Sequence, residues 1–436
     1  MKIDTRMPVL VALAAVLMAA PAGSQSPSPE PVIAIRAGRL LDVRQGRLRE
    51  NMLLLVRGER IEAVGPAAEV PIPAGARTID LSGATVLPGL IDAHTHLTWD
   101  SQSQRQTPPD ISVPHEPLIG ARTARLTLLA GFTAARNLGS NGFSDLALRD
   151  AIVAGDVPGP RLRASGTGMG IAGGVCDAAF QGGGTARGVE AVAQKVRDLV
   201  RAGADTIKVC AGGGVLATPK DAEGVEFSEE ELQAIVTEAH AASLPVAAHA
   251  QGPLAIRQAL AAGVDSIEHG GLIDEDTALQ MKQKNIYLVP TVYRLEWRVE
   301  NAEKAGADPA QLERLRQILA VNQENIRRAI RLGVPIALGT DATVFPHGFN
   351  ARELGSLVRL GLSPLEALRA ATLNAAALLR WSDDIGSLEP GKYADLIAVV
   401  GDPLQDVTTL QQVKFVMKGG RVYRNAFSPS DCLVEQ

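Results

Sequence analysis

The sequence predicts an α/β protein in which a closed (β/α)8 barrel is flanked by β-rich segments from both ends of the chain. Three observations favour this fold class. The 436 residues are 46% apolar and 21% charged, a globular rather than a disordered composition. Apolar strand-like runs alternate with amphipathic helical stretches between Thr85 and Arg380. Short β-type runs, separated by glycine and charged turns, occupy both ends.

Residues 1–22 have the pattern of a signal peptide. Lys2 and Arg6 precede an apolar run, Met7–Ala20, that is too short to span a bilayer. Small residues at the end of this run predict cleavage after Ala22, and a Ser/Pro-rich tether follows at 23–31. We therefore expect an exported protein, periplasmic or secreted, without a stable membrane anchor. An anchor that is never cleaved is the alternative.

Residues 32–84 and 385–436 are expected to pair into one β-rich domain. In the first segment, short strands are joined by turns such as 57–60, the pattern of an antiparallel meander. Short strand-like runs of the same kind occur again at 394–400 and 413–422.

The barrel is expected at 85–384. Eight strand-like runs lie there: Val86–Ile91, Ala134–Asn137, Arg161–Ala164, Thr206–Val209, Pro245–Ala248, Ser266–Glu268, Tyr287–Val289 and Pro335–Leu338. Eight parallel strands that alternate with helices over roughly 300 residues are typical of this fold. A doubly wound sheet is the alternative, but the glycines at 212–214 lack the spacing of a dinucleotide-binding loop. Close backbone approach explains these glycines better.

The charge and the cysteine content of the chain exclude some classes of function and of site. The chain has 43 basic and 48 acidic residues, a net charge of −5, and no Lys/Arg block, so nucleic-acid binding is not expected. Cys176, Cys210 and Cys432 are too few for a disulfide framework or a cysteine-rich zinc cluster, and at most one disulfide can form.

Metal-ligating residue types stand at the ends of five predicted strands. They are His94 and His96 after the first strand, Lys208 on the fourth, His249 on the fifth, His269 on the sixth and Asp341 on the eighth. Barrel enzymes build their sites at the carboxyl ends of the strands, and residues i and i+2 of one strand share a face. One such histidine alone would more often be a core group. Together they supply the nitrogen and oxygen donors that zinc prefers.

Lys208 does not fit this set as an ammonium group, because a cation would be repelled by two divalent ions. The site must deprotonate it or convert it to an anion, and carboxylation by carbon dioxide would yield a bridging carbamate. His240 lies in a helical pattern, where a surface or packing role is expected. His347, on the loop after the eighth strand, and Tyr293, after the seventh, are candidates for substrate binding.

These residues resemble the amidohydrolase superfamily, in the binuclear branch with a carboxylated lysine. The matching segments are 34–42, 86–96 and 386–396, besides the strand ends. Within the superfamily, the sequence is similar to prolidase-like and Xaa-Arg-type dipeptidases related to imidazolonepropionase, and to amidohydrolases that hydrolyse ochratoxin A. The resemblance implies a TIM barrel with a small β-sandwich formed by both chain ends, and a homo-oligomer, often an octamer.

The resemblance also assigns roles. It makes His94, His96 and Asp341 ligands of one metal, His249 and His269 ligands of the second, and Lys208 the bridge. It implies two divalent ions, expected to be zinc, whose bridging hydroxide attacks an amide carbonyl, while Asp341 passes the proton to the leaving amine. The expected substrate is a small peptide-like amide: an N-acyl amino acid, a dipeptide or the phenylalanine amide of ochratoxin A.

Three alternatives remain. The first is a hydrolase of the same superfamily that cleaves a lactone or a cyclic amide. The second is a mononuclear deaminase, against which Lys208 counts. The third is an exported binding protein without activity, which would not be expected to keep all six ligands.

Overall fold

The computed structural model describes residues 31–100, 112–180, 183–214 and 224–428. The predicted signal peptide, most of the tether and Cys432 lie outside these residues. In the part of the chain that is described, no helix combines the length and hydropathy needed to cross a membrane.

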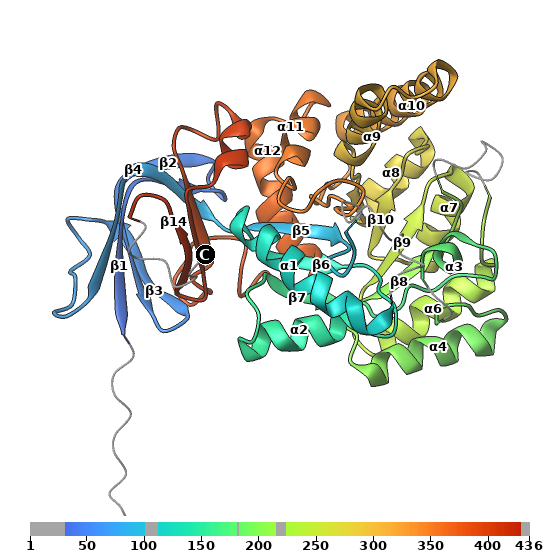
Figure 1. Cartoon of the computed structure of the whole chain (residues 1–436), viewed down its shortest axis with the longest axis horizontal. Helices are drawn as coiled ribbons and strands as arrows, with labels where there is room; N and C mark the ends of the chain where they lie inside the picture. Colours follow the sequence, from blue (N-terminus) through green and yellow to red (C-terminus); the bar gives the residue numbers. More distant parts are fainter. Residues whose placement is uncertain (1–30, 101–111, 181–182, 215–223, 429–436) are drawn as a thin grey trace, which may run out of the picture. The chain divides into compact units, whose positions relative to one another are not determined.

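Both ends of the chain contribute to one seven-stranded sheet, in the order β14-β13-β12-β4-β1-β2-β3 (Figure 1). Its strands are β1 (Val32–Asp42), β2 (Arg47–Arg57), β3 (Arg60–Pro66), β4 (Arg77–Pro88), β12 (Leu396–Val399), β13 (Phe415–Lys418) and β14 (Arg421–Asn425). The pairs β1–β2 and β2–β3 form the predicted antiparallel meander. The pair β1–β4 is parallel, which a meander does not predict. β12 joins the two chain ends by pairing with β4.

The central segment carries two parallel sheets, ordered β5-β6-β7 and β11-β10-β9-β8. Their strands are β5 (Leu90–Thr95), β6 (Phe132–Asn137), β7 (Arg161–Ala164), β8 (Ile207–Cys210), β9 (Val246–Ala250), β10 (Ser266–His269) and β11 (Tyr287–Val289). The first predicted run is split, because the chain leaves the large sheet at Pro88 and starts β5 at Leu90. Gly89 allows this passage, since a Cβ there would lie 1.9 Å from Thr133 Oγ1.

The predicted eighth strand is irregular. Pro335–Leu338 forms a single bridge, between Ile336 and Leu288, instead of a regular ladder. Its backbone nevertheless bonds to β11 through Leu288 N–H and the Pro335 carbonyl (2.8 Å), and to β5 through Ala93 N–H and the Leu338 carbonyl (2.8 Å). On the other side, Met169 links the chain after β7 to β8, since its N–H donates to the Lys208 carbonyl.

Helices alternate with these strands, as the sequence predicts. They are α1 (Glu116–Leu129), α2 (Ser144–Ala154), α3 (Val175–Ala179), α4 (Val189–Ala202), α6 (Glu229–Ala241), α7 (Pro253–Ala262), α8 (Glu275–Lys284), α9 (Tyr293–Lys304), α10 (Pro309–Leu332), α11 (Arg352–Arg359), α12 (Pro364–Arg369) and α13 (Ala375–Leu378). Short 3-10 turns lie at Val113–His115 and Val407–Gln412, and a π turn at Ala370–Asn374 joins α12 to α13. The largest hydrophobic core lies mainly between these helices and the parallel strands, and it extends to residues of the seven-stranded sheet such as Leu87 and Ile397.

Candidate metal centre

The six predicted ligands are brought together at the carboxyl ends of the parallel strands. His94 lies on β5 and His96 directly after it; Lys208 lies on β8, His249 on β9 and His269 at the end of β10, and Asp341 follows the irregular segment at 335–338. Each of these residues is at most 8% exposed. Titratable groups from five chain segments therefore share one buried space.

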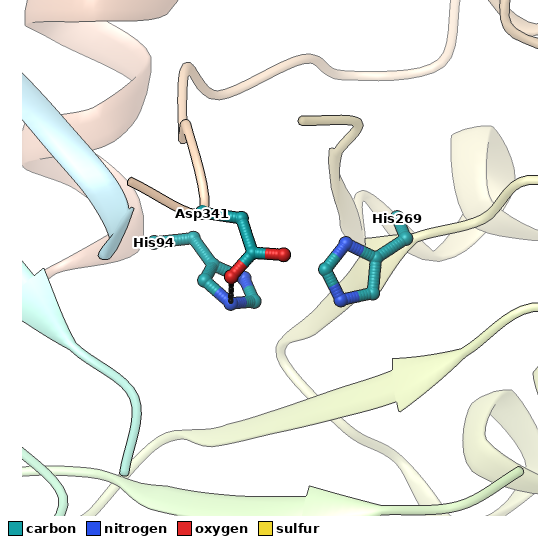
Figure 2. A group of neighbouring side chains, drawn as sticks. All are labelled: His94, His269 and Asp341. Carbon is teal, nitrogen blue, oxygen red and sulfur yellow. Dashed lines mark ion pairs between the residues drawn. The ribbon is translucent and has the colours of Figure 1, made fainter. Parts of the chain in front are cut away.

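Asp341 lies between the histidines of this cluster. Its Oδ1 lies 3.3 Å from His96 Nε2 and 3.6 Å from His94 Nε2. Figure 2 shows the carboxylate of Asp341 with the rings of His94 and His269 on either side. One ligand atom from each of these three residues lies within 4.8 Å of the others, close enough for a shared ion.

His249 and His269 form a second pair in the same space. Their ring centroids are 4.6 Å apart, and the ring of His269 lies 4.9 Å from that of His94. The side chain of Lys208 is buried as well, and its charge lowers the pKa of both His94 and His249.

The protonation states suit metal binding. Burial, reinforced by the charge of Lys208, lowers the pKa of His94 to about 4 and that of His249 to about 3. Burial and the charge of Arg294 hold the pKa of His269 well below its usual value. These imidazoles are therefore neutral at pH 7, the form that binds a metal.

Asp341 and Lys208 complete the donor set. Burial would raise the pKa of Asp341, but the hydrogen bond with His96 and the charges of His94 and Arg294 hold it far below its usual value, so the group is a carboxylate. Burial lowers the pKa of Lys208 to about 8, although Glu268 and Asp341 oppose that shift. Neutral imidazoles, a carboxylate and a readily deprotonated amine fit divalent zinc.

The backbone of this rim is held in an unusual conformation. His269 (φ 71°), Thr291 (φ 49°) and Asp341 (φ 57°) lie in the left-handed region, where residues other than glycine are uncommon. Such conformations cost roughly 1–3 kcal/mol each and cluster at functional sites. Gly339 brings Asp341 close to β5, because a Cβ at that position would lie 2.8 Å from His94 Cβ.

Glu268 and Arg136 support His94, although neither residue was predicted from the sequence to belong to the site. Glu268 Oε2 lies 2.7 Å from His94 Nδ1, and Oε1 accepts from Arg136 at 2.8 Å. Burial would raise the pKa of Glu268, but the charge of Arg136 and the contact with His94 lower it to about 2. The sequence did contain a signal, since Arg136 and Glu268 each lie inside an apolar strand-like run. Buried charges are almost always paired, so the two could have been expected to contact each other.

The conformation of His269 also explains why two adjacent residues reach the same histidine. In a regular strand, Glu268 and His269 would point to opposite faces. The positive φ of His269 ends this alternation, and both side chains contact His94. His269 Nδ1 in turn lies 2.7 Å from Thr291 Oγ1, which fixes the orientation of its ring.

Asp92 anchors the segment that carries Asp341. Its carboxylate accepts hydrogen bonds from Thr340 Oγ1 (2.6 Å) and Asn350 Nδ2 (2.7 Å), and the backbone N–H of His94 donates to it as well. Burial raises the pKa of Asp92 to about 6. This network joins the end of β5 to the Asp341 loop.

The two predicted substrate-binding residues lie at different places. His347 is buried, its Nε2 is 2.9 Å from the Trp99 carbonyl, and its Nδ1 makes no hydrogen bond in the described structure. Tyr293 packs against Phe345, and its hydroxyl accepts from Arg352 at 2.6 Å. His240 lies on α6 with its side chain exposed and its Nε2 2.9 Å from Asp265, which fits the expected surface role.

One disulfide, between Cys176 and Cys210, is present. Cys210 lies at the end of β8, two residues after Lys208, and Cys176 lies on α3. The two sulfurs pack with Trp99 and Phe180, and Trp99 stacks on His96 with ring centroids 5.0 Å apart. The disulfide therefore ties α3 to the wall of the candidate centre.

The part of the chain that forms the parallel sheets and carries the candidate centre matches a known protein family. The model of the amidohydrolase family matches residues 85–423, and the chain belongs to this family.

Particular members are similar over most of their length. Ochratoxinase of Aspergillus niger is 33% identical over 425 residues, which cover 90% of this chain and 87% of that protein. The crystal structure of a Xaa-Pro dipeptidase with methionine bound in its active site matches with a TM-score of 0.84 and 33% identity, covering 90% of this chain and all of that one. The crystal structure of A. niger ochratoxinase matches with a TM-score of 0.80 and 29% identity, covering 91% of this chain and 96% of that one. The family resemblance seen in the sequence is confirmed.

Proposed function

We propose that this chain is a binuclear metal-dependent amidohydrolase that cleaves peptide-like amide bonds in small substrates. The observation that carries the proposal is the buried convergence of His94, His96, Lys208, His249, His269 and Asp341 from five chain segments. Six such donors exceed what one tetrahedral zinc ion uses. Within an amidohydrolase, this set points to two ions and to hydrolysis.

The proposal includes a closed eight-stranded barrel. Two observations support closure: the segment at 335–338 bonds to both β11 and β5, and Met169 bonds to β8. These contacts lie at the two places where the parallel sheets would otherwise have free edges.

In the proposed centre, His94, His96 and Asp341 would hold one ion, His249 and His269 would hold the other, and Lys208, as a carbamate, would be a ligand of both. When bound, the ions would lower the pKa of water and polarise the amide carbonyl. The protein residues do the remaining work. Asp341, ionised at neutral pH, accepts the proton of the attacking water and delivers it to the leaving amine.

The surrounding side chains hold this arrangement in place. Glu268 and Arg136 fix the orientation of His94, and Thr291 fixes that of His269. The burial of all six ligands excludes bulk water, which strengthens each electrostatic interaction.

Two similar proteins support the substrate class. Their names, ochratoxinase and Xaa-Pro dipeptidase, describe action on an ochratoxin and on Xaa-Pro dipeptides. We therefore propose N-acyl amino acids, dipeptides and the phenylalanine amide of ochratoxin A as substrates. Export and self-association are proposed as well, and the Cys176–Cys210 disulfide supports export, because disulfides persist in oxidising compartments.

The test combines metal analysis with a substrate panel. Purified protein should contain two divalent ions per chain and hydrolyse members of a panel of dipeptides, N-acyl amino acids and ochratoxin A. Chelation should abolish turnover, and added zinc should restore it. His249→Asn should lose metal, whereas His240→Asn, which replaces an exposed histidine outside the centre, should keep it. One ion per active chain would contradict the binuclear centre, and turnover confined to lactones would contradict amide hydrolysis.

A further inference from the structure

Two arginines of α9, Arg294 and Arg298, lie beside the candidate centre and keep buried N–H groups without a partner among the described residues. Arg294 is buried, its Nε donates to Thr291 Oγ1 at 3.0 Å, and the same nitrogen lies 3.5 Å from Asp341 Oδ2. The NH2 group of Arg294 and the Nε of Arg298 are both buried and make no hydrogen bond within the described structure. Two guanidinium groups thus keep donors free next to the ligands.

This arrangement is costly unless something else binds there. Residues four apart on a helix lie on the same face, so Arg294 and Arg298 carry like charges side by side. Each buried donor without a partner costs about 1–3 kcal/mol. Arg136 shows the ordinary solution for a buried guanidinium, since Glu268 neutralises it at 2.8 Å.

The nearby acidic groups leave these buried donors unoccupied, although Asp341 Oδ2 faces the Nε of Arg294 at 3.5 Å. Asp341 is shared with His94 and His96. Glu353 uses its two oxygens to accept the backbone N–H groups of Val292 (2.8 Å) and Tyr293 (2.7 Å) at the start of α9. The free donors of the two arginines are therefore available to an external anion.

We propose that Arg294 and Arg298 bind the carboxylate of the amino acid that leaves the scissile amide. This inference rests on the proposed hydrolysis of amides. In an N-acyl amino acid, the scissile carbonyl carbon and the carboxylate carbon are separated by two atoms, at most about 4.3 Å along the bonds. With the carbonyl beside Asp341, the carboxylate reaches Arg294, which lies 3.5 Å from Asp341.

The consequence is specificity for amides with a free carboxylate on the leaving side. Dipeptides and N-acyl amino acids carry this group, whereas neutral amides and internal peptide bonds do not. Arginine is suited to this role, because its fixed fork of N–H donors matches a carboxylate.

The test compares two amides that differ in one carboxylate. N-benzoyl-L-phenylalanine carries it, and N-benzoyl-2-phenylethylamine lacks it. The wild-type protein should prefer the first by at least about 100-fold in kcat/KM. Arg298→Met should lower kcat/KM for the first amide about 10- to 100-fold and leave that for the second unchanged within about twofold. Arg298→Lys should recover part of the loss.

Matched variants separate recognition from structure. Arg298 is the main target, because Arg294 also holds Thr291 and thereby His269. Arg294→Lys should lower the preference for the carboxylate in the same direction. Arg359→Met is the control: it removes a charge from neighbouring α11, where the guanidinium already pairs with Glu296 at 2.6 Å, and should leave the preference unchanged.

Calorimetry gives a readout that does not depend on turnover. L-phenylalanine should bind the metal-loaded wild-type protein about 10- to 100-fold more tightly than Arg298→Met, whereas 2-phenylethylamine should not distinguish them. Equal losses for both amides, or no preference in the wild type, would overturn the carboxylate site while amide hydrolysis stands. If neither amide is hydrolysed, the proposed function fails on these substrates, and the binding of L-phenylalanine then decides the inference. Equal affinity of wild type and Arg298→Met for L-phenylalanine would overturn the carboxylate site.

Discussion

Replacing Glu268 by glutamine should destabilise the protein and weaken the candidate metal centre together. Glu268 is fully buried and neutralises Arg136, which is 1% exposed. Removing one partner of a buried ion pair costs about 3–5 kcal/mol, because the other charge stays buried and unpaired. The pKa of Glu268 supports this magnitude: a fall from 4.5 to about 2 on folding corresponds to roughly 3 kcal/mol at neutral pH.

The same substitution should disturb His94. Glu268 Oε2 contacts His94 Nδ1 at 2.7 Å, so its loss frees the ring. Changes to such supporting contacts typically reduce metal affinity 10- to 100-fold. We expect Glu268→Gln to bind zinc about 10- to 100-fold more weakly, measured by competition with a chelating dye.

Urea unfolding of the metal-free protein measures the stability effect. Glu389→Gln is the matched control, because Glu389 pairs with Arg44 where both side chains are about half exposed, and such pairs contribute at most about 1 kcal/mol. The pKa of Glu268 is lower in the folded state, so its contribution is present above pH 4.5 and is lost as the pH falls toward 2. The difference between wild type and Glu268→Gln should shrink over that range. A loss no larger than that of Glu389→Gln would refute this reasoning.

Substitutions at Lys208, Asp341, Cys176 and Glu353 test other parts of the site and the fold. Lys208→Ala should abolish turnover, and added short carboxylic acids should restore part of it; full metal content without rescue would argue for a structural lysine. Asp341→Asn should lower kcat by at least about 100-fold while metal content falls less, because the asparagine side chain keeps one oxygen donor but cannot accept the proton. Near-wild-type turnover across pH would remove Asp341 from the mechanism. Cys176→Ser should lower the free energy of unfolding by about 2–4 kcal/mol, since the disulfide to Cys210 closes a loop with a sequence separation of 34; an unchanged urea midpoint would contradict this. Burial raises the pKa of Glu353 from 4.5 to about 8, so its contribution to the free energy of unfolding is full below pH 4.5 and is lost as the pH rises through 8. Glu353→Gln should therefore flatten the decline in stability over that range, by at most about 1.4 kcal/mol per pH unit. Parallel curves of stability against pH for wild type and variant would count against this prediction.

The local sequence pattern was enough to group most residues of the candidate metal centre, because of the fold class to which they belong. The carboxyl ends of parallel strands meet at one edge, so polar residues that end apolar runs share that edge wherever the strands lie. Lys208, His249 and His269 could be grouped in this way without coordinates. The positions of most parallel strands followed from the same alternation. The exceptions are Val86–Ile91, which the structure divides between β4 and β5, and Pro335–Leu338, where the chain makes an isolated bridge.

Contacts between distant segments were decided by the tertiary structure alone. Periodicity describes one strand at a time, and it places Glu268 and His269 on opposite faces; the left-handed backbone of His269 turns both toward His94. The pairing of Cys176 with Cys210 likewise depends on where α3 meets β8.

The free donors of Arg294 and Arg298 show this division most clearly. The sequence by itself determined the class of fold, the amidohydrolase family and the residue types at the strand ends, because these depend on order along the chain. Whether a buried charge has a partner depends on what every neighbouring element brings to it. Only the folded chain shows that Arg136 is neutralised by Glu268, while the two arginines of α9 keep buried donors that have no partner in the part of the chain that the structure describes.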